Sequence, residues 1–74
     1  MTDKFQLTLR EQEILQLIAH GYMNKKIAVD LGTTEQVIKN NVSRILKKLD
    51  AMNRTAAVVI ASQNGLLPFE SKLQ

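Results

Sequence analysis

The sequence predicts an all-α fold, a four-helix bundle that contains a helix-turn-helix. Apolar residues recur at helical spacing, and the one β-branched cluster, at 58–60, is short and lies inside an alanine-rich run. A three-residue turn with a glycine, at 32–34, separates a short helical segment from a longer one, which is the layout of a helix-turn-helix. The 74 residues are enough for one domain, which we expect at 7–67 between flexible segments at 1–6 and 68–74.

The first helix is expected at about 9–20 and the second at about 24–31. Thr8 precedes Glu11 by three residues, the spacing of a capping box, in which each side chain binds a free backbone N–H of the first turn. Gly21 can take the positive φ that ends many helices. The faces that would be buried hold Ile14, Leu17 and Ile18 in the first helix, and Ile27, Ala28 and Leu31 in the second.

The third helix, at about 35–49 with Thr34 as its N-cap, carries the clearest pattern. Five aliphatic residues fall within one arc of about 100°: Ile38, Val42, Ile45, Leu46 and Leu49. The opposite arc is polar and holds Gln36, Asn40, Ser43 and Lys47, with Lys39 and Arg44 at its edges. Such amides and cations suit a reader of the major groove, since Asn and Gln pair with adenine and Lys with guanine or phosphate.

The fourth helix should begin near 53–55 and end at Asn64, before Gly65. Its segment 56–61 is apolar nearly all round. One face can pack on the other helices, but a domain of this size cannot easily bury the second face. This segment therefore suggests contact with a partner chain.

The composition excludes several classes of function. The sequence has no Cys and a single His, His20, so a metal site or a catalytic nucleophile–base pair is not expected. Aromatic residues make up 4%, too few for a platform on which single-stranded bases stack. No apolar run approaches the roughly 18 residues of a membrane span, and the N-terminus lacks a signal-peptide pattern. We expect a cytoplasmic domain that is not an enzyme.

The positive charge is concentrated in the middle of the chain. The formal net charge is +3, and residues 25–54 hold seven of the ten Lys and Arg residues against three of the seven acidic ones. Segregated charge of this kind indicates a polyanionic partner, although a solvated face is its commoner meaning.

Four ordered motifs carry a resemblance to a known family. They are LTLREQEIL at 7–15, GYMNKKIAVDL at 21–31, VIKNNV at 37–42 and KLDAMNR at 48–54. In this order and without gaps they resemble the LuxR/GerE-type helix-turn-helix DNA-binding domain, which has no wing, and the C-terminal domain of NarL-type response regulators. The resemblance covers residues 7–67.

The resemblance implies a homodimeric transcription regulator that binds double-stranded DNA at a pseudo-palindromic site, with RNA polymerase as a further partner. It implies no cofactor, metal or small molecule bound by this domain. Together with the polar arc it assigns base reading to Lys39, Asn40 and Ser43. Contacts to phosphates are expected for Asn24, Lys25, Thr34, Gln36, Arg44 and Lys47. The dimer contact is expected in the last helix, at Ala57, Val58 and Ala61.

Three positions depart from the family pattern. The family usually has Ser or Thr at position 23 as a helix cap; Met23 stands there, so we expect Asn24 to cap instead. Val37 and Asn41 replace the usual Thr and His. Both lie near the expected DNA side, and Val37 lacks the hydroxyl that could bond a phosphate.

One rival function stays open, a helical protein–protein interaction module that binds through its last helix and not to DNA. The dependence of binding on salt distinguishes this function from DNA binding, because binding to phosphates weakens steeply as salt is added and apolar docking hardly changes.

Overall fold

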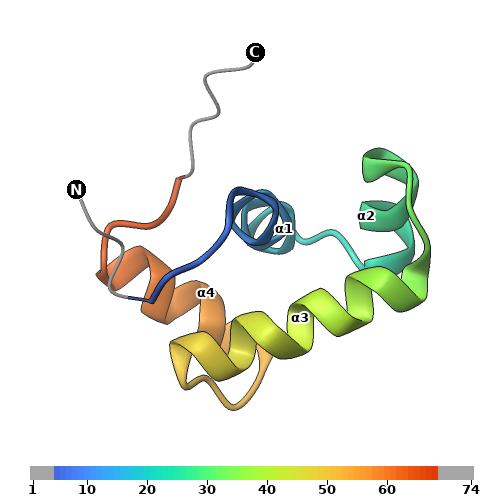
Figure 1. Ribbon diagram of the computed structural model, residues 1–74. Helices are drawn as coiled ribbons and strands as arrows, with labels where there is room; N and C mark the ends of the chain where they lie inside the picture. Colours follow the sequence, from blue (N-terminus) through green and yellow to red (C-terminus); the bar gives the residue numbers. More distant parts are fainter. Residues whose placement is uncertain (1–4, 69–74) are drawn as a thin grey trace.

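Four helices pack around a single aliphatic core in the computed structural model, which describes residues 5–68 (Figure 1). No strand occurs among these residues, and the expected all-α fold with a helix-turn-helix is confirmed. The helices are α1 (Leu9–Ala19), α2 (Asn24–Leu31), α3 (Glu35–Leu49) and α4 (Arg54–Gln63).

Local sequence sets the helix boundaries much as expected. Thr8 and Glu11 form the predicted capping box at the start of α1, which ends one residue earlier than expected, with His20 as its C-cap. Gly32 takes a left-handed conformation, φ 68°, and so turns the chain between α2 and α3. Thr34 caps α3 and Asn53 caps α4, each by accepting a hydrogen bond from a backbone N–H three residues on.

The start of α2 differs from the prediction. Met23 is the N-cap and its side chain makes no capping hydrogen bond, while Asn24 is the first helical residue. The prediction that Asn24 caps this helix is therefore wrong. The Asn24 amide oxygen instead accepts a hydrogen bond at 2.8 Å from Arg54, a residue distant in the sequence.

α3 is the central element of the fold. α2 packs beside the first half of α3 and α4 beside the second, while α1 lies over the middle of α3 and also contacts α4 (Figure 1). The aliphatic arc of α3 faces inward as expected, although Leu46 is only half-buried. The buried core consists of Leu7, Ile14, Leu15, Ile18, Ile27, Ala28, Ile38, Val42, Ile45, Leu49, Ala57 and Ala61.

The expected flexible segments fall mostly on residues 1–4 and 69–74, which lie outside the described residues. Phe5 and Gln6, however, are described. Phe5 packs against the core, and the backbone carbonyl of Gln6 accepts a hydrogen bond from Lys48 at 3.0 Å. Phe5 and Gln6 therefore contact the domain, while the expected boundary at Leu7 stays a prediction.

Candidate nucleic-acid interface

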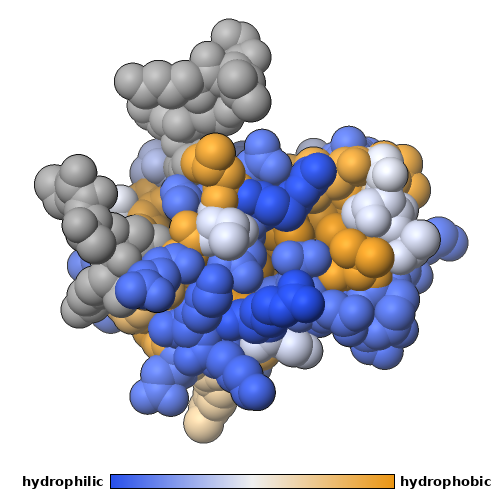
Figure 2. Space-filling model, in the orientation of Figure 1, coloured by the Kyte–Doolittle hydropathy of each residue, from blue (hydrophilic) through white to orange (hydrophobic). Residues whose placement is uncertain are grey.

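The side of α3 that faces away from the core carries the predicted base-reading residues. Lys39, Asn40 and Ser43 are all exposed, on successive turns of one rigid helix. We call this side the outward arc of α3; it consists of Gln36, Asn40, Ser43 and Lys47, with Lys39 and Arg44 at its edges. The surface over α3 is largely hydrophilic in Figure 2. The arc therefore presents amides, a hydroxyl and cations together on an accessible helix.

Three side-chain amides on α3 are held by hydrogen bonds within the helix. Gln36 Nε2 donates to Asn40 Oδ1 at 3.0 Å, and both side chains are exposed. Asn41 Nδ2 donates to the backbone carbonyl of Val37 at 2.9 Å, so this amide is bonded to its own helix and is half-buried. Asn40 is thus the more accessible of the two neighbouring asparagines.

The cations divide into two groups by their partners. Lys26 pairs with Asp30 at 3.1 Å, Lys48 pairs with Glu11 at 2.8 Å, and Arg10 pairs with Glu13 at 3.4 Å. Arg54 is also occupied, through hydrogen bonds. Among residues 5–68, four exposed cations have no carboxylate within ion-pairing distance, and these four were predicted to contact DNA: Lys25, Lys39, Arg44 and Lys47.

The other residues predicted to contact phosphates differ in their exposure and in the hydrogen bonds that they already make. Thr34 is exposed, but its hydroxyl oxygen already accepts a hydrogen bond from the Val37 N–H at 3.1 Å. Gln36 is exposed and bonded to Asn40. Asn24 is half-buried, and its amide oxygen is bonded to Arg54. Thr34 and Gln36 lie together at the N-terminal end of α3, whereas Asn24 and Lys25 lie at that of α2.

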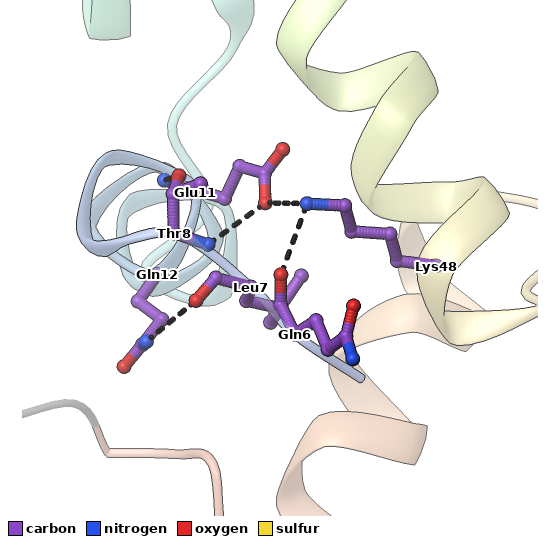
Figure 3. Close-up of polar contacts among 6 residues, drawn as sticks. All are labelled: Gln6, Leu7, Thr8, Glu11, Gln12 and Lys48. Atoms are coloured by element: carbon purple, nitrogen blue, oxygen red, sulfur yellow. Dashed lines mark hydrogen bonds and ion pairs between the residues drawn. The ribbon is translucent and has the colours of Figure 1, made fainter. Parts of the chain in front are cut away.

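A partly buried ion pair fixes α3 against the start of α1. Glu11 is only 3% exposed, and its Oε1 accepts hydrogen bonds from Lys48 Nζ at 2.8 Å and from the Thr8 N–H at 2.9 Å. Lys48 Nζ also donates to the Gln6 carbonyl, so three chain segments meet at one ammonium group (Figure 3). We call these four residues, Gln6, Thr8, Glu11 and Lys48, the Glu11–Lys48 junction.

The charges of the junction shift the titration of Glu11. Burial alone would raise the pKa of the Glu11 carboxyl, because a charged group loses hydration there. Hydrogen bonds from Lys48 and Thr8, with the charges of Lys48 and Arg44, outweigh that effect and place the pKa below its ordinary value of 4.5. Glu11 is therefore ionised at neutral pH, and Lys48 is committed to the fold.

Arg54 joins the start of α4 to the start of α2. Its Nη1 donates to Asn24 Oδ1 at 2.8 Å and its Nη2 donates to the Tyr22 carbonyl at 2.9 Å. The guanidinium thus contacts the segment that leads into the helix-turn-helix. Motif matching alone indicated that Arg54 belongs to the pattern but gave no signal of these two partners.

The residues predicted for the dimer contact are not equally accessible. Ala57 and Ala61 are fully buried in the core, so neither side chain is accessible in this structure, and their place at a dimer contact stays a prediction. Val58 is half-buried and Val59 is 49% exposed. Both line a groove of about 400 Å³ between the end of α1 and α4, which Met23 also lines. The accessible apolar surface of α4 is therefore centred on Val58 and Val59.

The described residues contain neither a group of three or more potential metal ligands nor a helix long and apolar enough to cross a membrane.

Residues 5–61 match the family described as bacterial regulatory proteins, luxR family. The chain is 33% identical to the transcription factor GerE, whose solved structure superposes with a TM-score of 0.79 and covers 86% of this chain and 96% of GerE. It is 45% identical over 65 residues to the transcriptional regulatory protein YvfU of Bacillus subtilis, covering 88% of this chain and 32% of YvfU.

The chain is also 49% identical over 61 residues to the response regulator VraR of Staphylococcus aureus, covering 82% of this chain and 29% of VraR. It thus spans about a third of the length of YvfU and VraR. Its fold matches GerE over nearly the whole of GerE. The chain belongs to the luxR family of bacterial regulatory proteins, and its four helices form the DNA-binding domain of a LuxR-family transcription regulator, not an enzyme.

Proposed function

We propose that the domain binds double-stranded DNA sequence-specifically by inserting α3 (35–49) into the major groove. The observation that carries this proposal is the division of the cations. Lys25, Lys39, Arg44 and Lys47 are exposed and without a carboxylate partner among residues 5–68, and all but Lys25 lie on or beside the outward arc of α3. An α-helix fits the major groove, and cations at the edges of the reading face can reach phosphates on either side.

Within this proposal Lys39, Asn40 and Ser43 read base edges, because they are exposed on the outward arc or at its edge. Lys25, Arg44 and Lys47 hold phosphates, together with Asn24 and Thr34 at the N-terminal ends of α2 and α3. No side chain caps α2, so its first-turn N–H groups can also take a phosphate oxygen. The bacterial chromosome is the target, so the domain acts in the cytoplasm.

Asn40→Ala tests base reading. Asn40 is exposed and Ala has the higher helix propensity, so the thermal unfolding midpoint should hold or rise slightly. Specific binding should fall about ten- to a hundred-fold, since one good amide–base pair is worth roughly 1–3 kcal/mol. Binding to random duplexes at the same salt should hardly change. The affinities for the specific and the random duplexes are both measured by fluorescence anisotropy, with the specific duplex chosen by selection from a random pool.

Asn41→Ala is the matched control, because this neighbouring amide is bonded to its own helix backbone. It should leave sequence preference unchanged. Equal losses of Asn40→Ala on specific and random DNA would reduce Asn40 to a positioning role, and no loss on either would remove it from the interface.

We further propose that two copies bind as a homodimer through α4, on half-sites about 10–10.5 base pairs apart, centre to centre. Support comes from Val58 and Val59, which leave an apolar surface and groove on α4. The two copies associate weakly in free solution and strongly when both are bound to DNA. A linked second binding event gains about 10²–10⁴ in avidity over either half-site alone.

Val58→Asp and Val59→Asp should remove this gain and leave binding to a single half-site unchanged. Val59 is the safer position, since half of its side chain is already in solvent. Leu9→Asp is the control, as a more exposed apolar residue at the start of α1. Sedimentation of protein with single-site and double-site duplexes gives the stoichiometry. Wild-type cooperativity in both α4 variants would overturn the α4 assignment.

A further inference from the structure

Gln36 and Asn40 form a pair of amides with a defined polarity on the outward arc of α3. They lie one helical turn apart, and Gln36 Nε2 donates to Asn40 Oδ1 at 3.0 Å. A side-chain amide has an oxygen that accepts and an –NH₂ group that donates two hydrogen bonds. With its oxygen turned to Gln36, Asn40 keeps both N–H donors of Nδ2 free. The two groups of a planar amide point in different directions, so Nδ2 faces away from Gln36.

The bond also restricts the Asn40 side chain before DNA arrives. The last torsion of an Asn side chain is broad and has two nearly equivalent orientations, which exchange the positions of oxygen and nitrogen. A single exposed Asn would therefore present donor or acceptor with little preference. Gln36 favours one of the two orientations, because in the observed bond its –NH₂ group donates to the Asn40 oxygen.

We propose that Gln36 is a positioning residue that sets what Asn40 reads. This inference rests on the proposed insertion of α3 into the major groove. Gln36 holds the Asn40 oxygen toward itself and leaves Nδ2 to donate to an acceptor on a base edge. Guanine and adenine both present N7 as an acceptor, guanine adds O6 and thymine presents O4, whereas cytosine presents only the N4 amino donor. The pair therefore favours a base with an acceptor, and rejects cytosine, at the position Asn40 contacts.

This role differs from a phosphate contact, which was the expectation for Gln36. A phosphate contact contributes about equally to every sequence, because the backbone carries no base information. A positioning residue acts only through Asn40, so its removal changes preference at one base pair. Gln36 is exposed and touches no core residue, which allows it to be changed without disturbing the fold.

The test compares the base preferences of four proteins, obtained by selection from a random duplex pool at one fixed salt concentration. The wild type should prefer a base with an acceptor, guanine, adenine or thymine, over cytosine about tenfold or more at one position. Asn40→Ala locates that position, because preference is lost there. Gln36→Met keeps the length and helix propensity but lacks the donor, and it should flatten preference at the same position while hardly changing binding to random DNA. The double variant should lose no more than Asn40→Ala alone.

Gln36→Glu reverses the polarity and is the sharper variant. A carboxylate can only accept, so it should attract Asn40 Nδ2 and turn the Asn40 oxygen outward. The base preference should then shift toward bases with an amino donor, cytosine N4 or adenine N6. The added negative charge should also lower the affinity for all sequences by about the same factor. Circular-dichroism melts should show all variants folded at the assay temperature.

The outcomes separate the two proposals. A wild type without sequence preference would overturn the proposed function and this inference together. A wild type with a preference that depends on Asn40 but not on Gln36 would leave the function intact and overturn the inference. Sequence-independent weakening by Gln36→Met would make Gln36 a phosphate contact, and a wild-type preference for cytosine at the Asn40 position would show the opposite amide polarity.

Discussion

Lys47 and Lys48 are neighbours on one helix and serve two different regions of the molecule. Lys47 is exposed on the outward arc of α3 with no carboxylate partner among residues 5–68. Lys48, one residue on and about 100° around the helix, is held in the Glu11–Lys48 junction by two hydrogen bonds to other segments. A count of basic residues therefore overstates the surface that is free for DNA.

The difference also shows how α3 keeps folding and binding apart. Its inward arc and Lys48 fix the position of the helix, whereas its outward arc makes few contacts with the rest of the domain. Stability and DNA affinity should therefore respond to different substitutions on the same helix. Three predictions test this separation, from the largest expected effect to the smallest.

Lys48→Ala should lower the free energy of unfolding by about 2 kcal/mol. It leaves the buried Glu11 carboxylate without its cation, a loss that costs several kcal/mol for a fully buried pair and less here because water reaches Lys48. In a domain of this size that corresponds to a fall of about 10 °C in the unfolding midpoint. Differential scanning calorimetry measures it.

The control is Lys47→Ala, which should leave the midpoint nearly unchanged. Adding Glu11→Gln to Lys48→Ala should recover part of the loss, since the unpaired charge is then gone. Equal destabilisation by the two lysine substitutions would contradict the separation.

Acid should destabilise the domain through the same junction. The pKa of Glu11 is lower in the folded than in the unfolded chain, so its contribution is fully present above the ordinary value of 4.5 and is lost as the pH falls through the folded pKa. The loss should be smaller than that of Lys48→Ala, because a protonated Glu11 is neutral. Urea denaturation at a series of pH values measures it. Glu11→Gln should weaken this acid-dependent loss, and Glu13→Gln should retain it.

Lys47→Ala should have the smallest effect, confined to DNA binding. Affinity should fall about equally for all sequences, and the slope of log affinity against log salt should decrease by about 0.9, the value for one phosphate. Titrations at several salt concentrations, below the unfolding temperature, measure the slope. Lys48→Ala should leave the slope unchanged, and an unchanged slope for Lys47→Ala would remove Lys47 from the phosphate contacts.

Much of the fold could be predicted because it depends on neighbours in the sequence. The capping box of Thr8 and Glu11, the Thr34 cap and the left-handed Gly32 each involve residues within a few positions of one another. The inward arc of α3 also follows from periodicity alone. Exposure of Lys39, Asn40 and Ser43 followed from the same periodicity, since the residues opposite a buried arc face solvent. What they contact on DNA stays a prediction.

The missed features depend on how distant segments meet. Lys48 and Glu11 are 37 residues apart, and Arg54 and Asn24 are 30 apart, so no local pattern signals either contact. α4 is apolar on nearly all sides, and periodicity could not decide which face turns inward. Small Ala57 and Ala61 face inward because close packing of α4 on the core leaves room only for small side chains, and bulkier Val58 and Val59 lie further out.

The two hydrogen bonds of Arg54 have a mechanical consequence for any paired use of this domain. They tie α4 directly to the start of α2, so a partner seated on α4 would be held at a set distance and rotation from the reading helix. The domain then keeps the partner and the reading helix in one fixed relative position. Each base pair inserted between half-sites moves one of them about 3.4 Å along the axis. The DNA would then have to twist to bring both half-sites back into line with the two reading helices. The stiffness of the DNA would therefore set which half-site spacings are tolerated.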